Sequence, residues 1–328
     1  MSKGNPFLGK VSGSVGDITL YSRASEQITR RRARTVKNPR TAAQTLNRVI
    51  ASTIGQAYSH MNDIVDHSFQ GYSTKAENMQ RFLKVNQQAI RKMLANSSDP
   101  LNQGSFQAVG QKGLVRFPFV LSEGSMPVIP VVLDSTAGAN QDPIIPINFT
   151  GEQAPTYQDI CDALRLKRGD QLTLCFVQGY ASSTPEDPDE FWGKTVAFRY
   201  ARIILDPVDD PSEVAPMTTP FFGVNGKVNF PNPRNVTDAI SAISIDEGRL
   251  AFALTNVGLL SHKCLAFAAI ASRKEGSTWL RSNSVLEVFA DFKRTPTLAQ
   301  AINASYPDTT GLTDPTKFLN AALGIKVG

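Results

Sequence analysis

QLTLCFVQ, residues 171–178, carries the clearest strand pattern of this 328-residue chain. Leu172, Leu174 and Phe176 alternate with Thr173 and Cys175. Successive side chains of a strand point to opposite faces of a sheet, so this stretch predicts a strand with one strongly apolar face.

Similar patterns recur from about residue 105 onward. We expect further strands at 113–121, 128–134, 143–149, 195–205, 249–256, 264–273 and 283–292. Strands of this length separated by frequent turns are typical of a β-sandwich or a jelly roll. Short helices are expected at 157–166, 237–242 and 297–304. Residues 206–220 contain four prolines and four acidic residues, which indicates a long loop or a boundary between two β modules.

Two long helices are expected before the β region. Asn38 and Pro39 form a helix start, and apolar residues then recur at helical spacing as far as Val65. Gly71 interrupts the pattern, and the pair Thr74 and Glu77 forms a capping box for a second helix that ends before 97–100. Because the connection is short, the pair is predicted to pack as an antiparallel αα-hairpin.

Positive charge is concentrated at the N-terminal end. Residues 1–50 hold ten of the 34 Lys and Arg but only two of the 29 acidic residues, a net charge of +8, while the remainder carries −3. A cationic arm on a nearly neutral body suggests a polyanionic partner for the arm and none for the body.

The arm itself is predicted to be a β-hairpin over 17–33, whose return strand carries arginines and presents Arg30 and Arg32 on one face. Guanidinium groups match phosphate oxygens, so these basic residues are the candidate nucleic-acid contacts. They are Arg23, Arg30, Arg31, Arg32, Arg34, Lys37 and Arg40. Two alternatives stay open: a solvated basic surface, and pairing with acidic loops at 186–190 or 206–213 of neighbouring subunits.

Other classes of protein find little support. No apolar run approaches the ~18 residues that span a bilayer, and no apolar signal core is visible at the N-terminus. Cys161, Cys175 and Cys264 are odd in number and widely spaced, so they are expected to be buried thiols in a reducing compartment.

Catalytic and metal-binding patterns are weak. His60 and His67 lack the spacing of a metal pair, and His262 with Cys264 lacks a third partner. The acidic stretch 186–190 does not continue as a calcium loop. We therefore expect no enzyme, no cofactor and no metal.

Several ordered motifs resemble a known family. The opening series consists of residues 3–10 (KGNPFLGK), 13–17 (GSVGD) and 37–44 (KNPRTAAQ), with an arginine-rich return strand between the last two. Residues 66–71 (DHSFQG) and 272–282 (SRKEGSTWLRS) add to it. They resemble proteins assigned as capsid proteins of gut-associated circular single-stranded DNA viruses, and a group of uncharacterised proteins from gut Bacteroidetes and their phages.

The resemblance implies a virion structural protein that forms a shell and has itself and packaged nucleic acid, expected to be single-stranded DNA, as partners. It would be made in the host cytoplasm and would not contact a membrane. The expected divisions are a basic arm (1–37), the αα-hairpin (38–97), β modules at 105–210 and 215–294 or one continuous sandwich, and a C-terminal tail (295–328). The alternative function is a phage or bacterial surface or tube protein built of Ig-like modules.

Overall fold

The computed structural model separates the chain into two compact units, Met1–Thr41 and Ala42–Gly328, called here the arm and the body. The structure describes residues 12–23, 26–31, 41–110, 114–133, 143–148, 155–180, 195–206, 240–246, 248–254, 262–288 and 296–305. The predicted helix start at Asn38 and Pro39 lies outside these ranges.

The arm contributes one three-stranded antiparallel sheet in the order β1-β2-β3. Its strands are β1 (Gly13–Val15), β2 (Ile18–Arg23) and β3 (Glu26–Arg31). The hairpin predicted over 17–33 is therefore present as β2 and β3, with an additional short strand before it.

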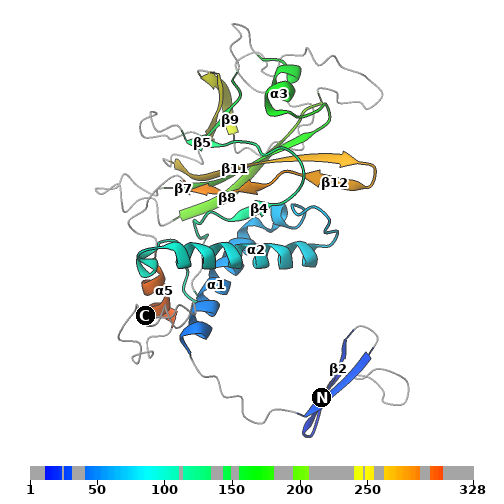
Figure 1. Ribbon diagram of the computed structural model, residues 1–328, viewed down its shortest axis with the longest axis vertical. Coiled ribbons are helices and arrows are strands. Elements are labelled where there is room, and N and C mark those ends of the chain that lie inside the picture. The colour runs from blue at the N-terminus through cyan, green and yellow to red at the C-terminus, as the bar shows by residue number, and fades with distance from the viewer. Residues whose placement is uncertain are drawn as a thin grey trace. The chain divides into compact units, whose positions relative to one another are not determined.

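The body is organised around one antiparallel sheet in the order β12-β11-β7-β8, called here the central sheet. Its strands are β12 (Thr278–Arg281), β11 (His262–Glu275), β7 (Gln171–Tyr180) and β8 (Thr195–Ile204), and β14 (Glu287–Val288) also pairs with β11. In Figure 1 this sheet lies between the helices α1 and α2 on one side and β9 with α3 on the other.

The predicted alternation of β7 divides the core into two clusters. Leu172, Leu174 and Phe176 are fully buried in a cluster on one face of the central sheet. Cys175 and Val177 are equally buried on the other face, against the helices. β7 is therefore covered on both faces.

A second antiparallel sheet, in the order β5-β6-β10-β9, shares the first cluster. Its strands are β5 (Val132–Leu133), β6 (Pro143–Pro146), β10 (Arg249–Leu254) and β9 (Ile240–Asp246). Helix α3 (Tyr157–Leu164) adds its buried Tyr157 and Ile160, and the capping box between Thr156 and Asp159 begins this helix.

The two long helices, α1 (Ala42–Val65) and α2 (Lys75–Asn96), cover the opposite face. Tyr58 of α1 contacts Phe82 of α2, and Asn47 near the start of α1 accepts a hydrogen bond from Arg91 near the end of α2. Early residues of one helix thus meet late residues of the other, as antiparallel packing requires. The predicted capping box of Thr74 and Glu77 is confirmed.

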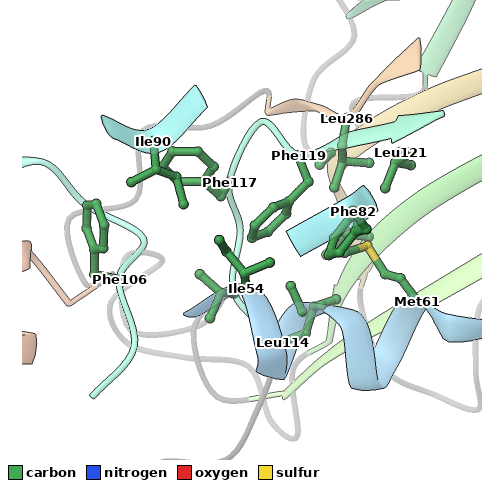
Figure 2. Close-up of a cluster of buried hydrophobic side chains, with 14 of the residues drawn as sticks. Ile54, Met61, Phe82, Ile90, Phe106, Leu114, Phe117, Phe119, Leu121 and Leu286 are labelled. Carbon is green, nitrogen blue, oxygen red and sulfur yellow. The ribbon is translucent and has the colours of Figure 1, made fainter. Parts of the chain in front are cut away.

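A chain of aromatic rings fills the space between the helices and the polypeptide that follows them (Figure 2). Phe82 lies 6.0 Å from Phe119, Phe119 lies 5.3 Å from Phe117, and Phe117 lies 6.0 Å from Phe106, measured between ring centroids. The buried amide of Asn86 pairs with the backbone of Val120, accepting from its N–H at 2.8 Å and donating to its carbonyl at 3.0 Å. This side chain joins α2 to β4 as a neighbouring strand would.

The remaining elements are short. They are the 3-10 helix η1 (Pro100–Asn102), strands β4 (Val120–Ser122) and β13 (Ser284–Val285), which pair with each other, and helix α5 (Leu298–Ser305). Helix α5 buries Leu298 and Ala301 in the core beside α1, so this part of the predicted C-terminal tail belongs to the body.

Several expectations are corrected. The helix predicted at 237–242 is wrong for residues 240–242, which lie in β9. Of the strand predicted at 113–121, only the last two residues are in β4. The two β ranges were left open as separate or continuous, and strands of 105–210 pair with strands of 215–294, β6 with β10 and β7 with β11. The fold is a mixture of helices and several antiparallel sheets.

Replacing Phe82 by Ala should destabilise the body by about 3–5 kcal/mol, because this fully buried ring contacts both Tyr58 and Phe119. The measurement is the urea midpoint of unfolding, followed by circular dichroism. The exposed Lys84 on the same helix is the control, and Lys84→Ala should leave the midpoint nearly unchanged. Equal midpoints for wild type and Phe82→Ala would contradict the packing.

Candidate nucleic-acid interface

The arm sheet holds three of the seven predicted contact residues on adjacent strands. β2 and β3 pair from Ile18 with Arg31 to Arg23 with Glu26, and β1 extends the sheet by pairing Val15 with Ile18. Because residues in register share a face, the pairing assigns each side chain to one of two faces.

One face of the arm sheet combines an aromatic ring with a cation. Thr19 is in register with Arg30, and Tyr21 is in register with Ile28. The guanidinium carbon of Arg30 lies 5.8 Å from the centroid of the Tyr21 ring, within cation–π range. We call this surface the Tyr21 face.

The opposite face is more apolar and is called the Ile18 face. Val15 and Ile18 lie side by side in register and are 57% and 46% exposed, with Leu20 next along the strand. Arg31 is in register with Ile18 and is exposed at the edge of this face. The two described arginines of β3 therefore point to different faces.

The structure brings only part of the predicted set together. Arg30 and Arg31 are exposed on β3, and Arg23 ends β2 opposite Glu26. The other predicted contacts lie outside the described residues; they are Arg32, Arg34, Lys37 and Arg40. The sharing of one face by Arg30 and Arg32 thus stays a prediction.

Three arginines of the body, Arg81, Arg168 and Arg273, pair with carboxylates of the same chain. Arg273 forms a two-pronged pair with the buried Asp170, at 2.7 and 2.6 Å. Arg81 contacts Glu123 at 2.6 Å. Arg168 contacts Asp206 at 3.1 Å, so one acid of the loop 206–213, considered above as a partner of neighbouring arms, has a partner within its own chain. The loop 186–190 lies outside the described residues.

The three thiols are free and buried, as their sequence surroundings predicted. Burial raises the pKa of the Cys161 and Cys175 thiols to about 12, and Cys264 is 1% exposed. A nucleophilic cysteine needs a lowered pKa and access to solvent. All three thiols are buried, and the pKa of two of them is raised.

The described part of the chain contains no group of three or more His, Cys, Asp and Glu residues that could hold a metal ion. His60 and His67 are exposed, His60 on α1 and His67 just after it. Within the described ranges, no helix is both long and apolar enough to cross a bilayer.

A second group of cations, Arg202 and Arg281, lines one cavity of the body and had no predicted role. The available signal was weak: Trp279 and Arg281 occupy alternate positions of one strand and so share a face. Their proximity to Arg202 follows from the pairing of four strands and could not be seen along the sequence.

Comparison with known proteins identifies no family for this chain. The chain matches no protein-family model, no curated protein and no solved structure.

The thiols give a direct check on the core. At neutral pH we expect none of the three cysteines to react with a disulfide reagent such as dithionitrobenzoate in the native protein, because all three are buried. For Cys161 and Cys175, a pKa of about 12 also leaves a thiolate fraction on the order of 10⁻⁵ at pH 7. All three should react in denaturant. Rapid labelling of one thiol in the native protein would contradict the described core.

Proposed function

We propose that this chain is a virion structural protein, a capsid or coat protein, that assembles with copies of itself into a shell. Its N-terminal arginines contact packaged nucleic acid without reading sequence, because phosphate contacts carry no sequence information. The observation that carries the proposal is the arm: a separate compact unit with arginines on a small sheet that has no core of its own.

The arm sheet needs a partner surface. None of its side chains whose exposure is described is buried, and its three strands have only three, six and six residues. Small sheets of this kind are marginal in water unless a hydrophobic face is covered. Binding to other molecules would supply the missing stabilisation, as expected for an arm that orders during assembly.

The two faces of the arm suit two different partners. The Tyr21 face offers a ring on which a base can stack and an arginine for the adjacent phosphate, the combination used by proteins that bind single strands. The Ile18 face offers exposed aliphatic side chains that suit a neighbouring subunit. One sheet could therefore link genome to shell.

The body suits the wall of a shell. The central sheet and the β5-β6-β10-β9 sheet bury side chains in one shared cluster, which supports a sandwich-like organisation with α1 and α2 covering the outer face of one sheet. The motifs of residues 3–45, 66–71 and 272–282, which resemble capsid proteins of gut-associated circular single-stranded DNA viruses, support the same proposal. That family also makes single-stranded DNA the expected genome.

Substitution of the arm arginines tests the nucleic-acid role. Binding of the wild-type chain to single-stranded DNA should weaken with salt, with a log–log slope of about −3 to −4 if four to six phosphates are neutralised. The double variant Arg30→Gln with Arg31→Gln should flatten the slope by about 1.4, or 0.7 per lost phosphate contact. The measurement is fluorescence anisotropy of a labelled oligonucleotide across a salt series.

The matched control is Lys84→Gln with Lys92→Gln, which removes two exposed charges from α2. It should leave the slope unchanged. Equal slopes for the wild type and the arm variant would contradict the nucleic-acid role. If the arm variant abolished assembly of nucleic-acid-free protein, the arginines would belong to subunit contacts instead.

A charge on the Ile18 face should separate assembly from nucleic-acid binding. In Ile18→Asp the exposed aliphatic patch is interrupted. We expect loss of shells in negative-stain electron microscopy while the melting temperature of the body is retained, because the arm is a separate compact unit. Thr29→Asp, on the same face but at a polar position, is the comparison and should disturb assembly less. Normal shells from Ile18→Asp would contradict this use of the face.

A further inference from the structure

A cavity of about 570 Å³ opens on the helix-covered face of the central sheet, where α1 ends. The connection between α1 and α2 forms one wall, and β7, β8, β11 and β12 form the others. The lining residues that matter here are His67, Thr173, Arg202, Ser272, Trp279 and Arg281.

Strand pairing brings these residues together from distant parts of the chain. Arg202 is in register with Thr173, Thr173 with Ile270, and Ser272 with Arg281. All of them share the face on which Cys175 packs against the helices. The cavity is therefore the part of this face that α1 leaves uncovered.

Among its described lining residues, the cavity has two guanidinium groups and no carboxylate. Arg281 donates from Nε to the carbonyl of His67 at 2.9 Å and from Nη1 to the carbonyl of Leu280 at 3.2 Å. Within the described residues neither Arg202 nor Arg281 forms an ion pair, unlike Arg81, Arg168 and Arg273.

The nearby acids are already engaged. Asp66 accepts a hydrogen bond from the hydroxyl of Tyr58 at 2.6 Å and contacts Lys75 at 3.4 Å. Glu123, whose backbone carbonyl accepts from Gln70, pairs through its side chain with Arg81. Neither carboxylate lines the cavity.

This arrangement has an electrostatic cost that an anion would relieve. The pKa of Arg281 is lowered to about 10, first by burial and then by the charge of Arg202. Two like charges that lie close together are stabilised by an anion placed between them. A phosphate carries enough negative charge to serve both arginines, and guanidinium forks match its oxygens.

The surroundings hold the cations and add neutral donors. The guanidinium carbon of Arg281 lies 4.7 Å from the centroid of the Trp279 ring, and that of Arg202 lies 5.3 Å from the Tyr200 ring. The hydroxyl-bearing residues Thr173 and Ser272, which also line the cavity, are only 6% and 5% exposed. Trp279 is 41% exposed, so its ring has free surface for a second planar group.

The wall that carries Arg281 is fixed by a close backbone contact. Gln70 accepts hydrogen bonds through Oε1 from the backbone N–H of Arg281 at 3.2 Å and that of Ser125 at 3.0 Å. A Cβ atom on Gly124 would lie 2.1 Å from the carbonyl oxygen of Arg281, so the segments around these two residues can approach this closely only with glycine at position 124. The site is thus built into the body and does not depend on the arm.

We propose that this cavity binds one nucleotide unit, with its phosphate group between Arg202 and Arg281 and its base against Trp279. A free nucleotide and one nucleotide of a single strand present the same chemistry, and the experiment below distinguishes them. The site is independent of the arm arginines and of the proposed shell.

The test uses the full chain with Trp192→Phe, which leaves Trp279 as its one indole. Its fluorescence is titrated with inorganic phosphate, with dAMP and with a short oligothymidine. We expect saturable changes with all three and tighter binding of dAMP than of phosphate. Arg202→Gln should weaken dAMP binding at least tenfold, and Arg202→Lys, which keeps the charge but loses the fork, should weaken it less.

Arg165→Gln, at an exposed position after α3, is the matched control and should bind as the parent does. Adding Arg30→Gln and Arg31→Gln removes the described arm arginines from the oligothymidine titration. In that background, tighter binding of oligothymidine than of dAMP identifies a strand as the ligand, and the reverse identifies a free nucleotide.

Two results would overturn the proposal. One is the absence of any response to dAMP at concentrations up to about 10 mM, which would place the dissociation constant well above the millimolar range. The other is an equal response to acetate and phosphate, which would assign the cavity to the carboxylate of an acidic side chain. Because the arm sheet does not contribute to the cavity, failure here leaves the proposed shell function untouched.

Discussion

The body depends on one strand, β7, being buried on both faces. Leu172, Leu174 and Phe176 require an apolar layer on one side, and Cys175 with Val177 requires another on the opposite side. The second sheet with α3 meets the first requirement, and the αα-hairpin with α5 meets the second. Once both layers are present, β11 and β8 are held beside β7, and the uncovered end of the helix-side face becomes the cavity between Arg202 and Arg281.

Local patterns were predictable from the sequence, and pairings over long distances were not. The capping box at Thr74, the alternation in 171–178 and the hairpin around Arg30 are each encoded within a few residues. By contrast, residues 240–242 look helical alone but form part of β9, because β10 provides backbone partners such as Ala253 for Ala242. The residues before Val120 look like a strand but do not form one. Phe117 and Phe119 are buried in the core cluster beside α1 and α2, and the side-chain amide of Asn86 takes the place of a strand partner for Val120.

Charge illustrates the same limit for function. The +8 of residues 1–50 is visible in a simple count and directs attention to the arm. The −3 of the remaining chain gives no sign of a cationic cavity. Acids of that part pair with Arg81, Arg168 and Arg273, whereas Arg202 and Arg281 form no ion pair among the described residues. Under the two proposals both cationic regions bind phosphate, the arm through an extended sheet and the body through a confined site.

The proposed function depends on the arm sheet binding nucleic acid through its Tyr21 face and a neighbouring subunit through its Ile18 face. The most direct measurement is an electron cryo-microscopy reconstruction of the purified, nuclease-treated wild-type protein. The account predicts a closed shell with protected nucleic acid, in which the Tyr21 face lines the interior and the Ile18 face contacts an adjacent copy. A solitary subunit, an open filament, or a shell with Arg30 on its outer surface would contradict it.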